Sequence, residues 1–92
     1  MEIIREDDGR KGAFKAIIED RPAGEMTYVW VGTTRFIIDH TEVDPGFNGR
    51  GIGKKLLMKA VDLAREKQVK IIPLCPFAKS MFAKIKEISD VL

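Results

Sequence analysis

Residues 44–57 read DPGFNGRGIGKKLL, and half of the eight glycines of the chain lie within this stretch. Before it, apolar residues alternate loosely, as they do in β-strands, whereas after Ile52 they recur at the spacing of an α-helix. The stretch is therefore a strand-to-helix connection. Its glycines let a ligand approach the backbone, and the first N–H groups of the helix have no partner within the helix. Both properties favour an anion-binding site.

The predicted helix begins at Ile52 and has a length of about 15 residues, with lysines on its outer face. Its inward apolar positions are Ile52, Leu56, Leu57, Ala60, Val61 and Ala64. Residues 70–74, KIIPL, predict a short strand, and Pro76 begins a second helix. The residues expected inward on that helix are Phe77, Met81, Phe82, Ile85 and Ile88. The last residues of the chain are expected to fray.

Four strands are predicted upstream of the glycines, at residues 2–5, 13–19, 26–31 and 36–43. Turns are expected between them, at residues 7–9, 20–24 and 32–34. Short turns join antiparallel strands, whereas a strand–helix–strand unit places its two strands in parallel. The expected class is α+β, with a four-stranded antiparallel meander, a parallel β-α-β crossover and a C-terminal helix. Ligands of such sheets bind beyond the carboxyl ends of adjacent parallel strands.

Composition sets broad limits on the function. The 92 residues are 45% hydrophobic and 33% charged, which predicts one globular domain spanning residues 1–92. The net charge of +2 is too small to indicate nucleic-acid binding by itself. No apolar run reaches the roughly 20 residues of a membrane span, and no signal peptide is expected. A lone cysteine forms no internal disulfide, which favours a cytoplasmic protein.

Two common phosphate-binding motifs do not fit the glycine stretch. A Walker loop would need Gly at Asn48 and Ser or Thr at Lys55, and a dinucleotide fingerprint would need Gly at Leu56. The cations Arg50, Lys54 and Lys55 near a helix N-terminus each cost about 0.3–1 kcal/mol, which a bound phosphate would remove. The alternative is a flexible connection with a solvated basic edge.

The segment Asn48-Gly49-Arg50-Gly51-Ile52-Gly53 resembles the acyl-CoA pyrophosphate loop of the GCN5-related N-acetyltransferases (GNATs). Their pattern is Gln/Arg-x-x-Gly-x-Gly/Ala, and Asn48 departs from it at the first position, which affects one side-chain contact. Two further segments, His40-Thr41-Glu42-Val43 and Ile72-Pro73-Leu74-Cys75-Pro76-Phe77, complete a resemblance to the small, minimal YjdJ-type GNATs. This resemblance covers nearly the whole chain.

The resemblance implies an acetyl-CoA-binding fold whose fourth and fifth strands splay apart to admit the pantetheine arm. It implies cofactor contacts from the backbone of Thr41 and Val43. Phe77 is expected in the core by its helical spacing, and alternatively its ring touches the CoA arm. The loop residues implied to bind the cofactor are Asn48, Gly49, Arg50, Gly51, Ile52, Gly53 and Lys54. The implied activity is acetyl transfer to a small amine or peptide, with no metal ion; the acceptor itself is not implied.

Cys75 is the first candidate for a catalytic residue. Because Pro76 suits the first position of a helix, Cys75 lies at or near the N-cap, where unpaired N–H groups and the helix dipole favour a thiolate. Its sulfur could accept the acetyl group or protonate the departing CoA sulfur. The alternative is a small buried apolar residue, as most lone cysteines are.

His40 is the only histidine and lies two residues from Glu42 on one strand, so both side chains share a face. A histidine beside a carboxylate can act as the base that deprotonates an ammonium acceptor. Alternatively, the two side chains simply pair with each other. Glu42 is a rival base, because full-size GNATs often use a glutamate on the fourth strand.

Three functions remain open at this point. The first is a GNAT-type acetyltransferase, and the second is a CoA-binding module without transfer activity, since so short a chain has little surface for an acceptor. The third is a nucleic-acid-binding protein that uses Arg50, Lys54 and Lys55. This last function is the weakest hypothesis, because no aromatic platform is interleaved with the three charges. The oligomeric state stays open.

Overall fold

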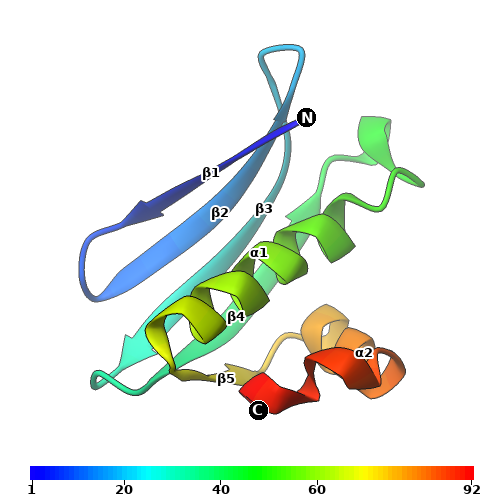
Figure 1. The fold of residues 1–92 in the computed structure, drawn as a ribbon. Helices are drawn as coiled ribbons and strands as arrows, with labels where there is room; N and C mark the ends of the chain where they lie inside the picture. Colours follow the sequence, from blue (N-terminus) through cyan, green and yellow to red (C-terminus); the bar gives the residue numbers. More distant parts are fainter.

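Five strands form one mixed sheet in the order β1-β2-β3-β4-β5 (Figure 1). The computed structural model describes all residues, 1–92. The strands are β1 (Glu2–Asp7), β2 (Lys11–Ile18), β3 (Arg21–Val31), β4 (Arg35–Val43) and β5 (Lys70–Pro73). The first three pairings are antiparallel and the β4–β5 pairing is parallel. The predicted meander and crossover are therefore confirmed.

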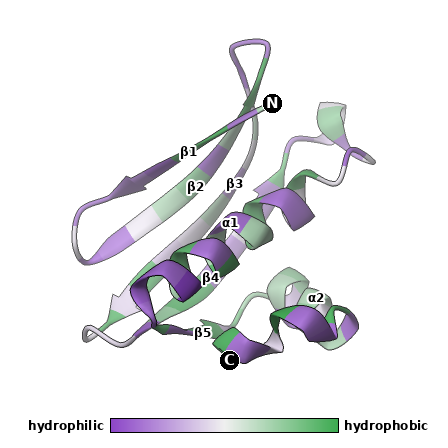
Figure 2. Cartoon of the chain, in the orientation of Figure 1, coloured by the Kyte–Doolittle hydropathy of each residue, from purple (hydrophilic) through white to green (hydrophobic).

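The helices lie on one face of this sheet and leave the other face open (Figure 1). They are η1 (Pro45–Phe47), α1 (Ile52–Lys67), α2 (Pro76–Lys84) and η2 (Lys86–Val91), of which η1 and η2 are 3₁₀ helices. Helix α1 crosses β2, β3 and β4, whereas α2 packs beside β4 and β5. Figure 2 shows hydrophilic segments along the outward side of α1, in keeping with its exposed lysines.

The core lies between α1 and the sheet and contains 21 buried hydrophobic residues. Every inward position predicted for the first helix is buried, so the helical periodicity was interpreted correctly. The largest fully buried side chains are Tyr28, Phe36, Met26, Ile38, Ile52, Leu56, Leu57, Ile88 and Val61. A continuous core under α1 fixes the start of that helix, and with it the glycine stretch, against the end of β4.

The turn predicted over residues 20–24 is wrong in extent. The structure turns within two residues, Glu19 and Asp20, whose φ angles are +51° and +65°, and β3 begins directly at Arg21. Two consecutive positive φ angles are typical of the tight hairpin turn that matches strand twist. Pro22 lies inside the strand and is tolerated because the pairing with β2 shifts register there through a β-bulge.

The end of the chain is ordered rather than frayed, which corrects a second expectation. Helix α2 ends at Lys84, and the chain continues as η2, in which Ile88 and Val91 are both 2% exposed. The Arg65 guanidinium on α1 holds the Asp90 carboxylate at 2.8 Å. Apolar burial and this ion pair therefore fasten the C-terminus beside α1.

Asp7 joins the edge strand β1 to β3 across β2. Asp7, Gly12 and Tyr28 occupy one row of the sheet, and Gly12 has no side chain, so Tyr28 reaches over it. The Asp7 Oδ2 atom accepts hydrogen bonds from Tyr28 Oη at 2.6 Å, Trp30 Nε1 at 2.9 Å and an Arg5 guanidinium nitrogen at 3.1 Å. Burial and the bond to Asp7 raise the pKa of Tyr28 to about 12.

Candidate functional site

The glycine loop, residues 48–54, takes a backbone conformation that residues with side chains rarely adopt. Gly49 and Gly51 have φ angles of +80° and +69°, in the left-handed region. A Cβ atom at either position would meet no atom within 4 Å. Glycine is therefore favoured there by backbone conformation, and the space in front of both residues is open to a ligand.

The N-terminus of α1 presents unpaired donors to this open space. Gly51 is the N-cap, no side chain caps the helix, and no acidic residue lies in its first turn. The Lys55 N–H makes the first intrahelical bond, to the Gly51 carbonyl at 3.1 Å. The N–H groups of residues 52–54 precede this bond and have no intrahelical partner. With the exposed Lys54 and Lys55, they form a positive end that suits phosphate oxygens.

Other loop side chains have different surroundings. The Arg50 guanidinium lies 5.2 Å from the centroid of the Phe47 ring, at the distance of a cation–π contact. Asn48 is exposed. Ile52 points into the core and is 2% exposed, so only its backbone faces the loop. The anion-binding part of the loop, called the cradle below, is thus made of the backbone N–H groups of residues 52–54, with the charged side chains of Arg50 and Lys54 beside it.

Gly53 and Phe77 bring the starts of the two α-helices into contact. A Cβ atom at Gly53 would lie 2.7 Å from Phe77 Cζ, so the ring packs directly on the backbone of the first turn of α1. Glycine is needed here for close approach rather than for its φ angle. The segment around Phe77 consequently lies beside the glycine loop, as the three-segment resemblance implies.

Strands β4 and β5 separate after a short pairing. Their ladder covers residues 35–38 of β4 and residues 70–73 of β5. It ends at the Ile38 carbonyl, which accepts hydrogen bonds from both the Leu74 N–H at 3.0 Å and the Cys75 N–H at 3.1 Å. Strand β4 continues to Val43, but its edge beyond Ile38 has no strand partner. The region where β4 and the start of α2 diverge, with Thr41 and Val43 on one side and Cys75 and Phe77 on the other, is called the β4–β5 cleft below.

The backbone of β4 directs two residues into this cleft. The Asp44 N–H bonds the Ala23 carbonyl next to β3 at 2.9 Å. Because backbone groups alternate sides along a strand, Val43 and Thr41 direct their N–H and C=O groups away from β3. A β-bulge lies just before them, where Tyr28 pairs with Ile38 and Thr27 with His40. The resulting free edge can bond an extended amide-containing chain.

Cys75 lies at the closed end of the cleft, where it is 4% exposed. It is the N-cap of α2, as predicted, and its Sγ accepts the Ala78 N–H at 3.3 Å. Thr41 Oγ1 lies 3.3 Å from the same sulfur. A buried nucleophilic atom is thus held between β4 and the start of α2.

His40 and Glu42 do not join Cys75. Their side chains lie on the open face of the sheet, His40 Nε2 is 3.7 Å from Glu42 Oε2, and the side chains are 63% and 76% exposed. Thr41, between them, points to the helix-covered face. The three candidate catalytic residues therefore form two groups. His40 and Glu42 lie on the open face of β4, and Cys75 lies on the helix-covered face.

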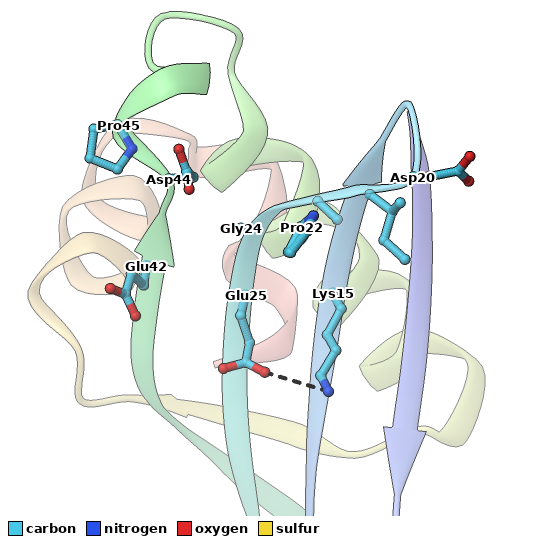
Figure 3. A pocket seen from close by; sticks show the side chains of 10 residues that line it. Lys15, Asp20, Pro22, Gly24, Glu25, Glu42, Asp44 and Pro45 are labelled. Carbon is cyan, nitrogen blue, oxygen red and sulfur yellow. Dashed lines mark ion pairs between the residues drawn. The ribbon is translucent and has the colours of Figure 1, made fainter.

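A pocket of about 420 Å³ lies on the open face near the end of β4 (Figure 3). Glu42 and Glu25 line it from neighbouring strands, and Asp44 lies just past the end of β4. Lys15 is its one basic residue and pairs with Glu25 at 3.9 Å. Figure 3 shows Asp20 pointing away from the other labelled side chains. The pocket has an excess of carboxylates, which suits a cationic ligand.

Sequence reasoning did not find the side-chain contact between Thr41 and Cys75, the bulge at Asp39, or Glu25 as a pocket residue. Thr41 was singled out for its backbone alone. Contacts across 34 residues of sequence, and an extra residue in one strand, leave no periodic signal. Only an accurate strand register would have revealed them.

Comparison with known proteins agrees with this geometry. Residues 13–91 match the family model described as GCN5-related N-acetyl-transferase. The match spans most of the chain, so the protein belongs to the GCN5-related N-acetyltransferase family. A search of curated protein sequences finds no match. No helix of the structure has the length and apolar character needed to cross a membrane.

Solved structures share the fold. The solution structure of a GCN5-like protein from Staphylococcus aureus is 38% identical, with 98% of this chain and 85% of that chain covered and a TM-score of 0.77. A ribosomal-protein-alanine N-acetyltransferase from Brucella melitensis is 20% identical over 85% of this chain and 62% of its own, with a TM-score of 0.72. A GNAT from Elizabethkingia anophelis, with acetyl-CoA bound, is 14% identical over 90% and 72%, with a TM-score of 0.71.

Proposed function

We propose that this protein is an acetyl-CoA-dependent N-acetyltransferase. The observation that carries the proposal is the convergence of three sequence segments on one cleft. Thr41 touches Cys75, and Gly53 touches Phe77, so the edge of β4, the glycine loop and the start of α2 lie against one another. A family member of the same fold is known with acetyl-CoA bound, which supports this cofactor.

The chain supplies two kinds of recognition to acetyl-CoA. The uncapped N–H groups of residues 52–54, with Lys54, bind the pyrophosphate at the start of α1. The free edge of β4 at Thr41 and Val43 bonds the amides of the pantetheine arm, as an added strand would. A backbone N–H near Val43 also donates to the thioester carbonyl oxygen and stabilises the charge that develops there.

The acceptor amine approaches from the open face in this proposal. An amine attacks only after its ammonium form loses a proton, so a base is needed near β4. Glu42 and His40 are exposed on that face, and the pocket with Glu25 attracts a cation (Figure 3). Two similar folds, an aminoglycoside acetyltransferase in complex with sisomicin and the Brucella enzyme, are named for amine acceptors, which supports an amine here. Cys75 is the lone cysteine and forms no disulfide within the chain, which is consistent with the cytosol.

Calorimetric titration with acetyl-CoA tests the cofactor part of the proposal, and release of free CoA thiol from acetyl-CoA in the presence of candidate amines separates an acetyltransferase from a module that only binds CoA. Saturable binding at one site is expected for acetyl-CoA and for CoA. Pantetheine, which has the arm but no pyrophosphate, is expected to bind at least about tenfold more weakly, since it loses roughly 1.4 kcal/mol or more of anion recognition. The absence of binding by both acetyl-CoA and CoA would contradict the proposed function.

A titration with single-stranded RNA in parallel covers the nucleic-acid alternative. If Arg50, Lys54 and Lys55 served a nucleic acid, RNA would bind with an affinity that falls steeply with salt concentration. We expect no saturable RNA binding at moderate salt. Saturable RNA binding combined with no response to CoA would favour the alternative.

A further inference from the structure

Four charged side chains form a line along the outward side of α1, called the charged stripe below. All four are exposed, and they recur at intervals of three or four residues, which places them above one another on the helix: Lys55, Lys59, Asp62 and Glu66. The stripe spans about three turns, or roughly 16 Å. It belongs to the hydrophilic outward side of α1 that Figure 2 shows.

The order of the charges along the stripe is unfavourable for an isolated helix. Lys55 and Lys59 are four residues apart, and so are Asp62 and Glu66, and like charges at this spacing repel each other. The lysines also lie in the N-terminal half of the stripe and the carboxylates in the C-terminal half, which is the reverse of the order that the helix dipole favours. A partner of complementary charge would relieve both effects.

The chain itself provides no ion-pair partner for the charged stripe. The five ion pairs of the structure leave out all four of its side chains. Arg65 lies near Asp62, but Asp90 already binds it at 2.8 Å. Arg5, which lies near Glu66, is likewise paired with a carboxylate on its own strand, β1. The charges of the stripe are therefore available to a second molecule.

The charged stripe is complementary to a second copy of itself in the opposite direction. Its four members are spaced symmetrically about the midpoint between residues 60 and 61. A twofold axis beside this midpoint would place Lys55 of one copy opposite Glu66 of the other, and Lys59 opposite Asp62. Because a twofold axis repeats every contact, two antiparallel α1 helices would form each of these ion pairs twice.

Met58 supplies an apolar contact on the same side of α1. It is half-buried and lies between the two lysines of the stripe, where it lines a shallow hollow together with Ile3 and the 53% exposed Met1. The flexible thioether side chain of methionine adapts readily to a facing surface. An apolar centre with charged residues around it is the usual arrangement of a protein–protein interface.

We infer that this protein associates with a second copy of itself through the charged stripe, as a twofold-symmetric dimer with antiparallel α1 helices. The inference is independent of the proposed function. A face of three helical turns is smaller than the roughly 800 Å² per partner of a standard interface, so the dimer is weak. We expect a Kd of roughly 10–100 µM at low salt. Single chains then prevail at a few micromolar, where unfolding of the monomer is measured.

Analytical ultracentrifugation of the full chain tests the inference. Protein is measured from about 5 µM to about 500 µM, a range that brackets the expected Kd, at low and at high salt. The variants are Lys59→Glu, Asp62→Lys and the double variant with both changes; these positions are chosen because Lys55 also lies beside the cradle. Lys84→Glu, an exposed site on α2, changes the net charge as Lys59→Glu does and serves as the control. Thermal unfolding at low concentration shows that each protein is folded.

We expect the mass of wild type to rise with concentration from 10.4 kDa toward twice that value. High salt should weaken the dimer about threefold or more, because it screens exposed charges. Each single reversal should weaken it at least about tenfold, since like charges then face each other twice. The double variant should recover to within about threefold of wild type. An equal mixture of the two single variants should form a heterodimer, because each then carries the charges that the other lacks.

Several results would overturn the inference. Wild type that stays at 10.4 kDa up to the highest concentration at low salt does not dimerise. A dimer that tolerates both single reversals uses another face of the molecule. An equal loss in Lys84→Glu would attribute the effect to net charge instead of the stripe. Failure of both the double variant and the mixture to recover association would rule out the pairing of Lys59 with Asp62.

Discussion

Gly51→Asp is expected to abolish measurable acetyl-CoA binding while the protein stays folded. Gly51 caps α1 at the centre of the cradle, and a side chain there would enter open space, without a clash. Aspartate tolerates a left-handed φ better than most residues. A carboxylate at a helix N-terminus also favours the helix by about 0.3–1 kcal/mol. The same charge opposes the pyrophosphate, at a cost of several kcal/mol.

That cost corresponds to a loss of affinity of about 100-fold or more, measured by calorimetry. Gly51→Asn is the matched control, because it has the same size and tolerance of positive φ but no charge. We expect it to weaken binding by roughly tenfold or less, through bulk alone. Thermal unfolding should show both variants to be folded. Wild-type affinity in Gly51→Asp would locate the anion site elsewhere on the protein.

Asp7→Ala is expected to lower the free energy of unfolding by about 3 kcal/mol at pH 7. The substitution removes one carboxylate oxygen that accepts bonds from Tyr28, Trp30 and Arg5. It leaves the part-buried Tyr28 hydroxyl without its Asp7 acceptor. In a chain of this size, the loss corresponds to a decrease of roughly 12–24 °C in Tm. Urea unfolding of wild type and variant measures it.

The difference between wild type and Asp7→Ala should depend on pH. Burial raises the pKa of Asp7, but the hydrogen bonds from Tyr28 and Trp30 outweigh it, so the pKa lies below its ordinary value. A lowered folded-state pKa stabilises the protein above the unfolded-state value of about 3.9. This contribution is lost as the pH falls through the folded-state pKa, so the difference in stability between the two proteins should narrow there. Asp62→Ala, on the exposed face of α1, should show neither effect.

An Asp7→Ala protein as stable as wild type at pH 7 would mean that β1 is held mainly by its backbone ladder to β2. The hydrogen bonds of Asp7 across the row formed by Asp7, Gly12 and Tyr28 would then contribute little to the free energy of unfolding. A stability difference between wild type and Asp7→Ala that narrows at high rather than low pH would contradict the direction of the pKa shift of Asp7.

The parts of the fold that follow from local periodicity were predictable. The inward stripe of α1 and the change of period after residue 44 define the crossover, and the crossover puts β5 beside β4 in parallel. The glycine loop was also accessible, because Gly49 and Gly51 are needed for backbone angles that few residues adopt. Cys75 at the N-cap of α2 followed from Pro76 alone.

The remaining features depend on pairing between distant strands. The tight turn at Glu19 and Asp20 has neither of the usual glycine or asparagine signals, so the start of β3 was placed too late. Ile88 and Val91 are buried because α1 provides a surface for them, which the sequence of the tail does not reveal. The division of His40 and Cys75 between the two faces of β4 depends on the register beyond the bulge.

The carbonyl oxygen of Ile38 determines how far the two parallel strands can close. It accepts the N–H groups of both Leu74 and Cys75, the two residues after β5, so neither N–H is free to extend the ladder toward Val43. The cleft is consequently held open by main-chain bonding, which does not depend on which side chains line it. Substitutions of side chains along both walls are therefore compatible with an unchanged separation of the two strands.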